Sequence, residues 1–466
     1  MSIEKHSPGR FHFISKPQNV FLLLGTFFGL LFVFVTPPAL VGDEPHHFFR
    51  AYQISEGQII GEKRDDLSGG WIPKSVLYTN RKLVGDIEMK HHVKFDTALL
   101  SELINLPLND EDKVFERFPN TVIYSPIPYI PQVLGIIVGK FFNTPALVLI
   151  YLARIANLFF FLGLAYFAIK KIPVHKWVLC LLCLMPTSVF QVASASADTF
   201  TYGICFLTIA FFLSYALDEQ RKLSHVRIAV IFILSLLSVL TKQAYIFLPF
   251  LFLLIPRRKF SSLRNYLFSF FILLLTSFGA VAAWSAAVKP IYLPYRIDQP
   301  MSPEEQASFI LSHPFTFLKM VVSDYFFHFW FYFKSFSGQL TWFDLYVPDF
   351  LPVVIFIVLL GFGLFDKNSK FYFGRSDKFI FAGIFVCTAL LISALLYMSW
   401  SPIRGSSIEG IQGRYFIPIA PVFFLLFYNR KINWDSFDRY AHIIVYLTTI
   451  VSLLITINSI IHRYYV

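Results

Sequence analysis

The sequence is poor in charged residues. Aspartate, glutamate, lysine and arginine make up 15% of its 466 residues, whereas a soluble domain of this size carries about 25%. The deficit extends along the whole chain: 56% of the residues are hydrophobic, and the mean hydropathy is +0.60. This composition excludes an ordinary soluble protein and predicts a chain that crosses the lipid bilayer repeatedly.

Cysteine is also scarce. The four cysteines, Cys180, Cys183, Cys205 and Cys387, all lie in apolar runs. Cys180 and Cys183 have the spacing of a CxxC motif, but the run around them is predicted to be a helix within lipid. We therefore interpret them as small core residues rather than as a redox or zinc-binding pair.

Several sequence features that would indicate other functions are missing. No DNA- or RNA-binding motif accompanies the net charge of +11, so we expect no nucleic-acid partner. The excess positive charge lies in short loops, which is the pattern that sets membrane orientation. No cleavable signal sequence is evident, because the first apolar run is too long for one. Internal repeats and low-complexity segments are not evident either.

The apolar runs predict an all-α polytopic membrane protein, a single membrane domain over residues 1–466 with about eleven transmembrane helices. A run of some 20 residues crosses the ~30 Å hydrocarbon core. Lys5, Arg10 and Lys16 place the N-terminus in the cytoplasm, and alternation of the basic loops places the C-terminus outside. The predicted spans are residues 20–41, 146–169, 177–192, 199–217, 226–240, 245–255, 266–284, 349–365, 379–398, 415–428 and 441–460.

Two larger segments are predicted on the outer face. Residues 43–145 form a first outer loop, within which the proline-broken run 124–142 is interpreted as an interfacial or re-entrant helix. If that run crossed the membrane, every later loop would change side, against the positive-inside rule. Residues 285–348 form a second outer segment, whose aromatic stretch 325–336 is interrupted by charged residues and is expected along the interface.

A polar cluster directly follows the first apolar run. Asp43, Glu44, His46 and His47, with Arg50 just beyond, stand where a membrane helix ends. Charge at that depth is costly unless it faces a protein-lined cavity, so an acidic pair there indicates a functional site. The alternative is a plain helix end entering water. We rank it second, because other polar residues are predicted on the same side.

The outward-facing polar residues indicate a site for an anion. Basic residues there run against the usual orientation trend, and arginine and lysine bind phosphate as a planar fork and as a point charge. Nearby carboxylates act as a general base or as metal ligands. The residues placed on this side are Asp43, Glu44, His46, His47, Arg50, Asp198, Lys242, Arg404, Glu409, Gln412 and Arg414.

Structural alternatives stand beside several of these assignments. Asp198 also fits the N-cap of a helix starting at Thr199, and Lys242 also fits a side chain that extends to the membrane interface. His47 follows Glu44 by three residues, a helical spacing compatible with a hydrogen bond or a shared metal; orientation of the carboxylates is the favoured role. Gly410 and Gly413 permit a close approach of backbone to a ligand beside Arg414.

Five motifs in order resemble a family of predicted bacterial polytopic membrane proteins of unknown function, the DUF2142-like family. That family is in turn similar to the GT-C glycosyltransferase superfamily. The resemblance runs from about Gly42 to Pro418. The motifs are Asp43-Glu44-Pro45-x-His47-x-x-Arg50-Ala51, Tyr124-Ser125-Pro126, Ser194-Ala195-Ser196-Ala197-Asp198, Thr241-Lys242-Gln243-x-Tyr245 and Gly410-Ile411-Gln412-Gly413-Arg414-Tyr415.

The GT-C resemblance implies a catalytic base at the end of the first helix and an inverting transfer from a polyprenyl-phosphate sugar. It assigns Asp43 as the base, Glu44 as its partner and Asp198 as the second acidic position. Lys242, Arg404 and Arg414 are added as candidates for binding the phosphate, because they are positively charged and are predicted on the outer side. His47, Arg50, Gln412 and Tyr415 complete the expected substrate-binding residues. The first loop shows no clear Asp-x-Asp metal motif, so no cofactor is assigned and dependence on a divalent metal stays open.

Three functions are therefore carried forward. The first is a glycosyltransferase of the bacterial plasma membrane, with a polyprenyl-phosphate sugar as donor and an envelope glycan or lipid as acceptor. The second is a transporter or flippase for polyprenyl-linked glycans, which would place charges near mid-membrane in broken helices, often with repeat symmetry. The third is a non-catalytic assembly protein of the envelope.

Overall fold

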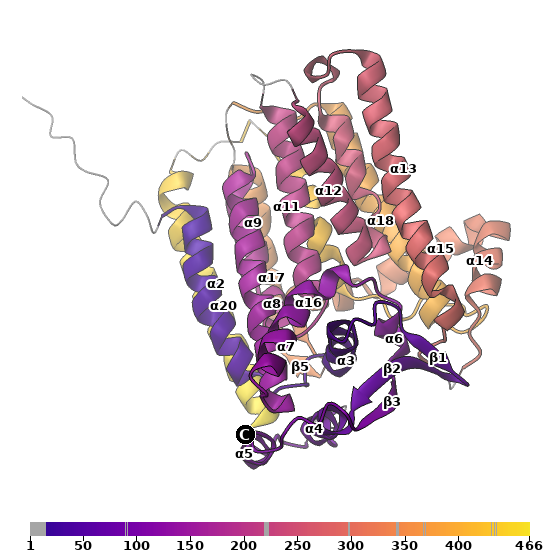
Figure 1. The fold of residues 1–466 in the computed structure, drawn as a ribbon. Helices are drawn as coiled ribbons and strands as arrows, with labels where there is room; N and C mark the ends of the chain where they lie inside the picture. Colours follow the sequence, from indigo (N-terminus) through magenta and orange to yellow (C-terminus); the bar gives the residue numbers. More distant parts are fainter. Residues whose placement is uncertain are drawn as a thin grey trace, which may run out of the picture.

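The computed structural model describes residues 15–88, 90, 92–218, 223–296, 299–341, 344–366, 368, 370–429, 431–432, 434 and 436–466. Within these residues the chain is a bundle of helices with a smaller, partly β-stranded region at one end (Figure 1). Lys5 and Arg10, on which the cytoplasmic placement of the N-terminus partly rests, lie outside the described residues.

Among the residues that the structure describes, six helices are long and apolar enough to cross a membrane. The first begins at the same end of the bundle as the last, and the two run in the same direction (Figure 1). The six are α2 (Pro17–Val35), α8 (Ala146–Lys171), α11 (Asp198–Leu217), α13 (Leu263–Val288, continued by η5, Lys289–Ile291), α18 (Arg375–Trp400) and α20 (Phe437–Tyr464). The expectation of a multi-pass helical membrane protein is confirmed.

The other predicted spans are shorter or broken helices, so the number eleven stays a prediction. Prolines and backbone turns interrupt several of them, as at Pro186 between α9 and α10. They are α9 (Lys176–Leu184), α10 (Pro186–Val192), α12 (His225–Thr241), η2 (Gln243–Tyr245), η3 (Leu248–Leu254), α17 (Phe350–Phe365), η6 (Gly413–Ile419) and α19 (Ala420–Leu425), with η4 (Arg257–Lys259) after η3.

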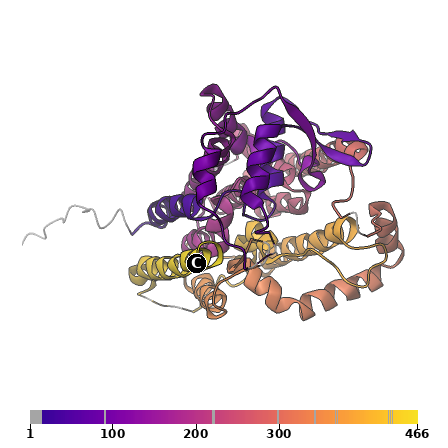
Figure 2. The same cartoon turned by 90° about the horizontal axis from the view of Figure 1, so that it is seen from below.

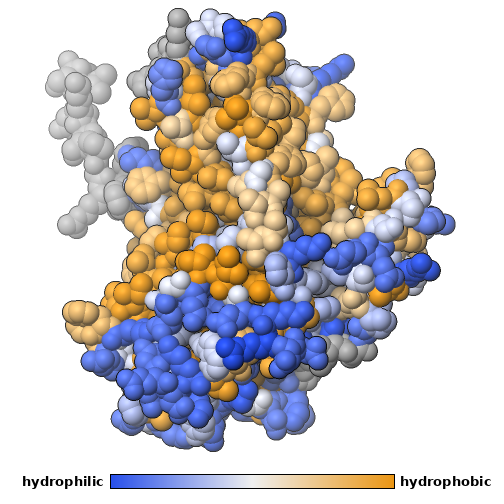
Figure 3. All heavy atoms as spheres, turned by 45° about the vertical axis from the view of Figure 1, so that its right-hand side comes forward, coloured by the Kyte–Doolittle hydropathy of each residue, from blue (hydrophilic) through white to orange (hydrophobic). Residues whose placement is uncertain are grey.

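The surface shows where lipid would surround the bundle. In Figure 3 an apolar belt separates a small hydrophilic end from a larger hydrophilic region. Large apolar side chains are exposed within the long helices, including Phe27, Phe268 and Phe271 at 58%, 64% and 62%. In water such a surface would be strongly unfavourable, whereas in hydrocarbon it is solvated.

Small residues bring α2 and α8 together. Gly25 and Gly29 are four residues apart on α2 and face Leu162 and Leu158, which are four apart on α8. A Cβ on Gly29 would lie 2.5 Å from Leu158, so only glycine permits this approach. One further turn of α8 along the same face places Arg154 beside the end of α2.

The predicted first outer loop, residues 43–145, is more structured than its sequence indicated, and we call it the first outer segment. It contains α3 (Glu44–Ser55), α4 (Lys74–Val84), α5 (Ala98–Leu103), α6 (Pro119–Val122), η1 (Ile127–Tyr129) and α7 (Ile130–Phe141). It also contains a three-stranded antiparallel sheet, β1 (Glu62–Arg64), β2 (Leu67–Pro73) and β3 (Lys113–Arg117), in which Glu62 pairs with Gly69 and Trp71 with Phe115. The sequence analysis did not predict this sheet.

The second outer segment consists of short helices and a hairpin. They are α14 (Pro303–Ser312), α15 (Pro314–Phe327), α16 (Phe329–Ser337), β4 (Gln339–Leu340) and β5 (Leu345–Tyr346). Seen from below, α15 (orange) lies on the other side of the molecule from the first outer segment (purple) (Figure 2). The ends of the long helices between the two segments carry the polar cluster described next.

Candidate functional site

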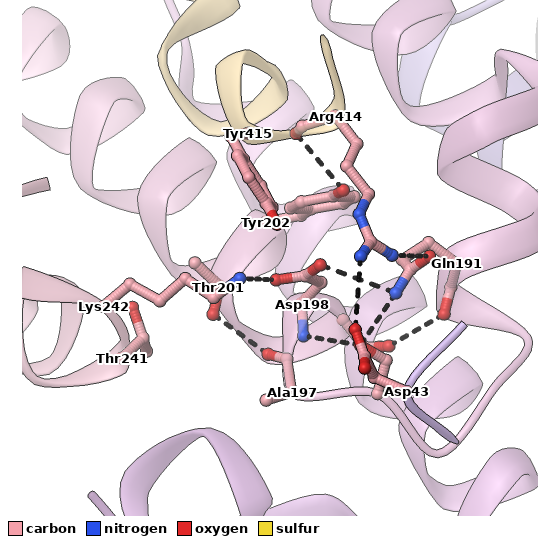
Figure 4. Close-up of polar contacts among 12 residues, drawn as sticks. Asp43, Gln191, Ala197, Asp198, Thr201, Tyr202, Thr241, Lys242, Arg414 and Tyr415 are labelled. Atoms are coloured by element: carbon pink, nitrogen blue, oxygen red, sulfur yellow. Dashed lines mark hydrogen bonds and ion pairs between the residues drawn. The ribbon is translucent and has the colours of Figure 1, made fainter. Parts of the chain in front are cut away.

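Four charged side chains from distant parts of the sequence meet where the bundle joins the outer region (Figure 4). Asp43 precedes α3, Asp198 begins α11, Lys242 follows α12 and Arg414 lies in the first turn of η6. We call these four residues the charge cluster. It brings together four of the site residues predicted from the sequence.

The pair Asp198 and Lys242 forms the buried half of the charge cluster. The Lys242 ammonium donates to Asp198 Oδ1, and the two side chains are 15% and 5% exposed respectively. The ammonium also lies 5.8 Å from the ring centre of Tyr124 and 5.2 Å from that of Tyr415, within reach of a cation–π attraction. These contacts favour a fixed position for Lys242 over a side chain that merely extends toward the interface.

Arg414 connects the two halves of the charge cluster. Its Nη2 lies 3.7 Å from Asp43 Oδ2, and its Nη1 donates to Gln191 Oε1 at 3.1 Å. The Gln191 amide in turn donates to Ser196 Oγ at 2.8 Å and approaches Asp198 Oδ2 at 3.5 Å. The hydroxyl of Tyr202 donates to the Arg414 carbonyl, which holds the start of η6 against α11.

Asp43 is the most accessible member of the charge cluster. Its side chain is 39% exposed, against 5%, 13% and 15% for Asp198, Arg414 and Lys242. Its backbone has φ +63°, a left-handed conformation that aspartate tolerates better than most residues. Asn120 donates to Asp43 Oδ1 at 3.1 Å, so one oxygen faces Asn120 and the other faces Arg414.

Glu44 does not share this environment. It forms a fully buried ion pair with Arg154: Nε and Nη2 of the guanidinium donate to Glu44 Oε1 and Oε2 at 2.7 and 2.6 Å. The backbone N–H of Ala195 also donates to Oε1, and that of Val41 to Oε2. Both oxygens of Glu44 thus have partners, and the structure places Glu44 apart from the charge cluster; its role as a catalytic partner of Asp43 stays a prediction.

Arg50 and Arg404 also lie apart from the charge cluster. Arg50 is fully buried and donates to Gln53 and to the carbonyls of Ile59 and Tyr124, so it ties α3 to neighbouring backbone. Arg404 is exposed, and its backbone N–H donates to Gln306 of α14. The structure places both residues outside the charge cluster, and their roles in substrate binding stay predictions.

The two histidines act as neutral hydrogen-bonding groups. His46 Nδ1 bonds Asn120 Oδ1 at 2.8 Å, and His47 Nδ1 bonds the Tyr129 hydroxyl at 2.9 Å rather than Glu44. Burial lowers the pKa of both rings, and that of His47 falls to about 4 despite the nearby carboxylates of Asp43 and Asp198. His47 is therefore uncharged at neutral pH and supports the wall behind Tyr124.

Sequence reasoning missed Gln191, Asn120 and Arg154. Gln191 and Arg154 stand in apolar runs, where a polar side chain in a predicted span is itself a functional signal. Of the remaining expected residues, Tyr415 packs on Lys242, and Gln412 lines a small recess together with Gln191 and Arg414. The ion pair of Glu409 goes to Arg296, outside the charge cluster.

The described residues hold no group of three or more histidine, cysteine, aspartate or glutamate side chains placed to bind one metal ion. Asp43 and Asp198 each have a cation as partner instead, Arg414 and Lys242 respectively. What the charge cluster can do chemically is to accept a proton at its exposed carboxylate, Asp43, while the neighbouring cation Arg414 binds an anion.

The comparisons with known proteins identify the family and no function. No curated protein and no solved structure matches the chain. A family model described as "Predicted membrane protein (DUF2142)" matches residues 24–423, which include every member of the charge cluster. The chain therefore belongs to the DUF2142 family of predicted membrane proteins.

Proposed function

We propose that the protein is a membrane glycosyltransferase that moves a sugar from a polyprenyl-phosphate donor to an envelope glycan or lipid at the outer face of the bacterial plasma membrane. One observation carries this proposal. An exposed carboxylate, Asp43, lies 3.7 Å from the buried cation Arg414 at the end of a membrane bundle. A base and a phosphate-binding group are the two parts that such a transfer needs at one place.

In the proposed reaction Asp43 takes the proton of an acceptor hydroxyl. The acceptor oxygen forms a bond to the anomeric carbon of the sugar, and the bond from that carbon to the phosphate oxygen breaks. The polyprenyl phosphate leaves with the electron pair. Attack from the face opposite the phosphate inverts the anomeric centre, as the GT-C resemblance implies.

The charges of the cluster support this sequence of events. Two carboxylates and two cations sum to zero, so the resting cluster is neutral. Once Asp43 is protonated, the cluster carries one net positive charge, at the moment when the leaving phosphate gains negative charge. Stabilisation that grows toward the transition state accelerates the chemical step, whereas stabilisation present throughout does not.

The residues of the cluster divide into two roles. Arg414 is the cation for the phosphate, because its contact with Asp43 is long and leaves room for exchange of partners. Lys242 and Asp198 are locked together and, through Gln191, hold Arg414 in place. Tyr415 packs against the Lys242 ammonium, and His47 packs against Tyr124, the second ring beside Lys242; both support the position of Lys242.

The test is a transfer assay with purified protein and a panel of polyprenyl-phosphate sugars, measuring release of polyprenyl phosphate with and without EDTA. Asp43→Asn should lose about 10²- to 10⁴-fold in rate, the usual contribution of a general base. The matched control is Asp66→Asn, which removes an exposed carboxylate from the turn between β1 and β2. A change in rate with EDTA would decide the open question of a divalent metal.

Two results would contradict the proposal. Full activity in Asp43→Asn would remove the base. If no donor released polyprenyl phosphate while proteoliposomes moved a polyprenyl-linked glycan between leaflets, the protein would be a flippase. Binding of envelope proteins with neither activity would favour the assembly function.

A further inference from the structure

A small polar recess lies beside Arg414. Thr187 and Gln191 of α10, Ser335 of α16, Thr341 after β4, and Gln412 with Arg414 line it. It has room for about one water-sized group, so it accepts a single substituent of a ligand and not a whole ring. Arg414 is the one charged residue of this lining, and hydroxyl and amide groups supply most of the remaining polar surface.

The walls of the recess are fixed to the turn that presents Asp43. Thr341 Oγ1 donates to the Leu40 carbonyl at 3.1 Å, and a Cβ on Gly42 would lie 3.1 Å from the Thr341 carbonyl. On the opposite side, the Gly413 N–H donates to Ser335 Oγ at 2.8 Å. A group seated in the recess would therefore be held at a defined position relative to Asp43.

Two residues of the lining each carry a buried polar atom that lacks a protein partner within the described part of the chain. These atoms are Thr187 Oγ1, on a side chain of a residue that is 2% exposed, and Arg414 Nε. Leaving such groups unpaired costs about 1–3 kcal/mol each. Arg414 Nε can only donate, so the group that satisfies it must offer an oxygen acceptor.

We propose that this recess recognises one oxygen substituent, a hydroxyl or an N-acyl carbonyl, on the sugar of the donor. This inference rests on the proposed function and deepens it. The substituent accepts a hydrogen bond from Arg414 Nε and pairs with the Thr187 hydroxyl, while Nη1 keeps its bond to Gln191 and Nη2 faces the phosphate. Thr187 is thereby a specificity-determining residue, because its hydroxyl favours donor sugars that carry the matching substituent.

A phosphate oxygen shares this acceptor chemistry, but the recess is poorly suited to a phosphoryl group. A phosphate is too bulky for a space of this size, and Arg414 would be its one cation. Lys242, the second cation of the cluster, is engaged by Asp198 and is not part of the lining. Sugar hydroxyls, in contrast, fit a site whose polar surface comes mainly from neutral hydroxyl and amide groups.

The experiment measures affinity for a short-chain polyprenyl phosphate and for the same phosphate carrying glucose, galactose, mannose or N-acetylglucosamine. We expect the wild type to prefer at least one conjugate over the bare phosphate. Thr187→Val keeps the shape of the side chain and removes its hydroxyl. It should weaken the affinity for that conjugate about three- to tenfold without changing the affinity for polyprenyl phosphate that carries no sugar. Thr449→Val is the matched control, since Thr449 is fully buried, lacks a described hydroxyl partner and lies on α20.

Each outcome decides between the ideas. If Thr187→Val lost the same affinity for the sugar conjugate as for polyprenyl phosphate without a sugar, the recess would be a phosphate subsite. This result would overturn the inference. A fall in thermal stability with all affinities unchanged would mean that the recess holds a structural water only, which overturns it as well. Wild-type binding of bare phosphate with no preference among sugars would also reject it, yet would leave the proposed function standing. If no polyprenyl phosphate bound at all, both proposals would fail.

Discussion

Asp43 and Glu44 are adjacent in the sequence but face opposite environments. Glu44 is completely buried against Arg154, whereas the side chain of Asp43 is 39% exposed and approaches Arg414. The turn with positive φ at Asp43 separates the two carboxylates. One is a structural anchor for α2, α8 and the segment before α11, and the other is available for chemistry.

The first prediction concerns the anchor. Arg154→Met should lower the free energy of unfolding by about 3–5 kcal/mol, because it leaves Glu44 charged and buried without its partner. Chemical unfolding in detergent, followed by tryptophan fluorescence, measures this. Asp43→Asn is the control and should change stability by less than about 0.5 kcal/mol. The double variant Glu44→Leu/Arg154→Met should recover part of the loss; recovery of none would contradict a dominant role for the unpaired charge.

The second prediction concerns Asp198 and Lys242. A double-mutant cycle with Asp198→Asn and Lys242→Met should give a coupling energy of about 0.5–3 kcal/mol, since the pair is buried and in direct contact. The exposed pair Glu62 and Arg64 offers a comparison, expected below about 1 kcal/mol because water screens it. Equal coupling energies in the two pairs would contradict the idea that the pair of Asp198 and Lys242 holds Arg414 in place.

The third prediction concerns acidity. The pKa of His47 is lowered to about 4 by burial, against 6.5 in the unfolded chain. The unfolded state therefore binds more protons between pH 6.5 and pH 4, and stability falls as the pH drops through that window. From pH 7 to pH 5 the loss attributable to His47 is about 2 kcal/mol.

His47→Gln should remove this part of the pH dependence while keeping a group that can bond the Tyr129 hydroxyl. Melting temperatures across pH 4–7.5 test it, with His225→Gln as the control because His225 lies at the start of α12, outside the outer region. An unchanged slope in His47→Gln would show that other groups cause the acid sensitivity.

The fourth prediction concerns the backbone beside Arg414. A Cβ on Gly413 would lie 2.0 Å from the Tyr332 carbonyl, so Gly413→Ala must displace α16 or the start of η6. We expect a clear loss of thermal stability together with loss of phosphate affinity, because Arg414 moves with its neighbour. Gly383→Ala in α18 is the matched control: no atom lies within 4 Å of its added Cβ, and alanine favours a helix by up to about 1 kcal/mol.

Sequence reasoning recovered those parts of the molecule that follow from composition. A deficit of charge and long apolar runs suffice to predict a helical multi-pass protein, because hydrocarbon admits few alternatives. Charge and predicted side, together with the GT-C resemblance, named Asp43, Asp198, Lys242 and Arg414 as site residues, and the structure brings these four together. The sheet around Trp71 was missed, since β1 and β3 are short and rich in charged residues, and β2 contains two glycines and ends in a proline.

The expected site residues that lie apart from the charge cluster do so for a common physical reason. Glu44 and Arg50 have the same sequence signature as catalytic residues, namely charge at the end of a span. Whether such a residue faces a cavity or an ion pair depends on its partner, and the partner of Glu44 is Arg154, 110 residues away. Arg154 lies inside an apolar run that we predicted to be a membrane span. The sequence around Glu44 or around Arg154 therefore does not reveal that the two residues form an ion pair.

The anchor also constrains the order in which the molecule can be assembled in a membrane. Glu44 emerges early during translation, but its partners arrive 110 and 151 residues later, at Arg154 and Ala195. Until then a carboxylate without compensation sits at the edge of the bilayer behind the first helix. Insertion of α8 brings Arg154 to Glu44 and ends that exposure. We therefore expect that nascent chains in which α8 fails to pack against α2 are the ones that are degraded.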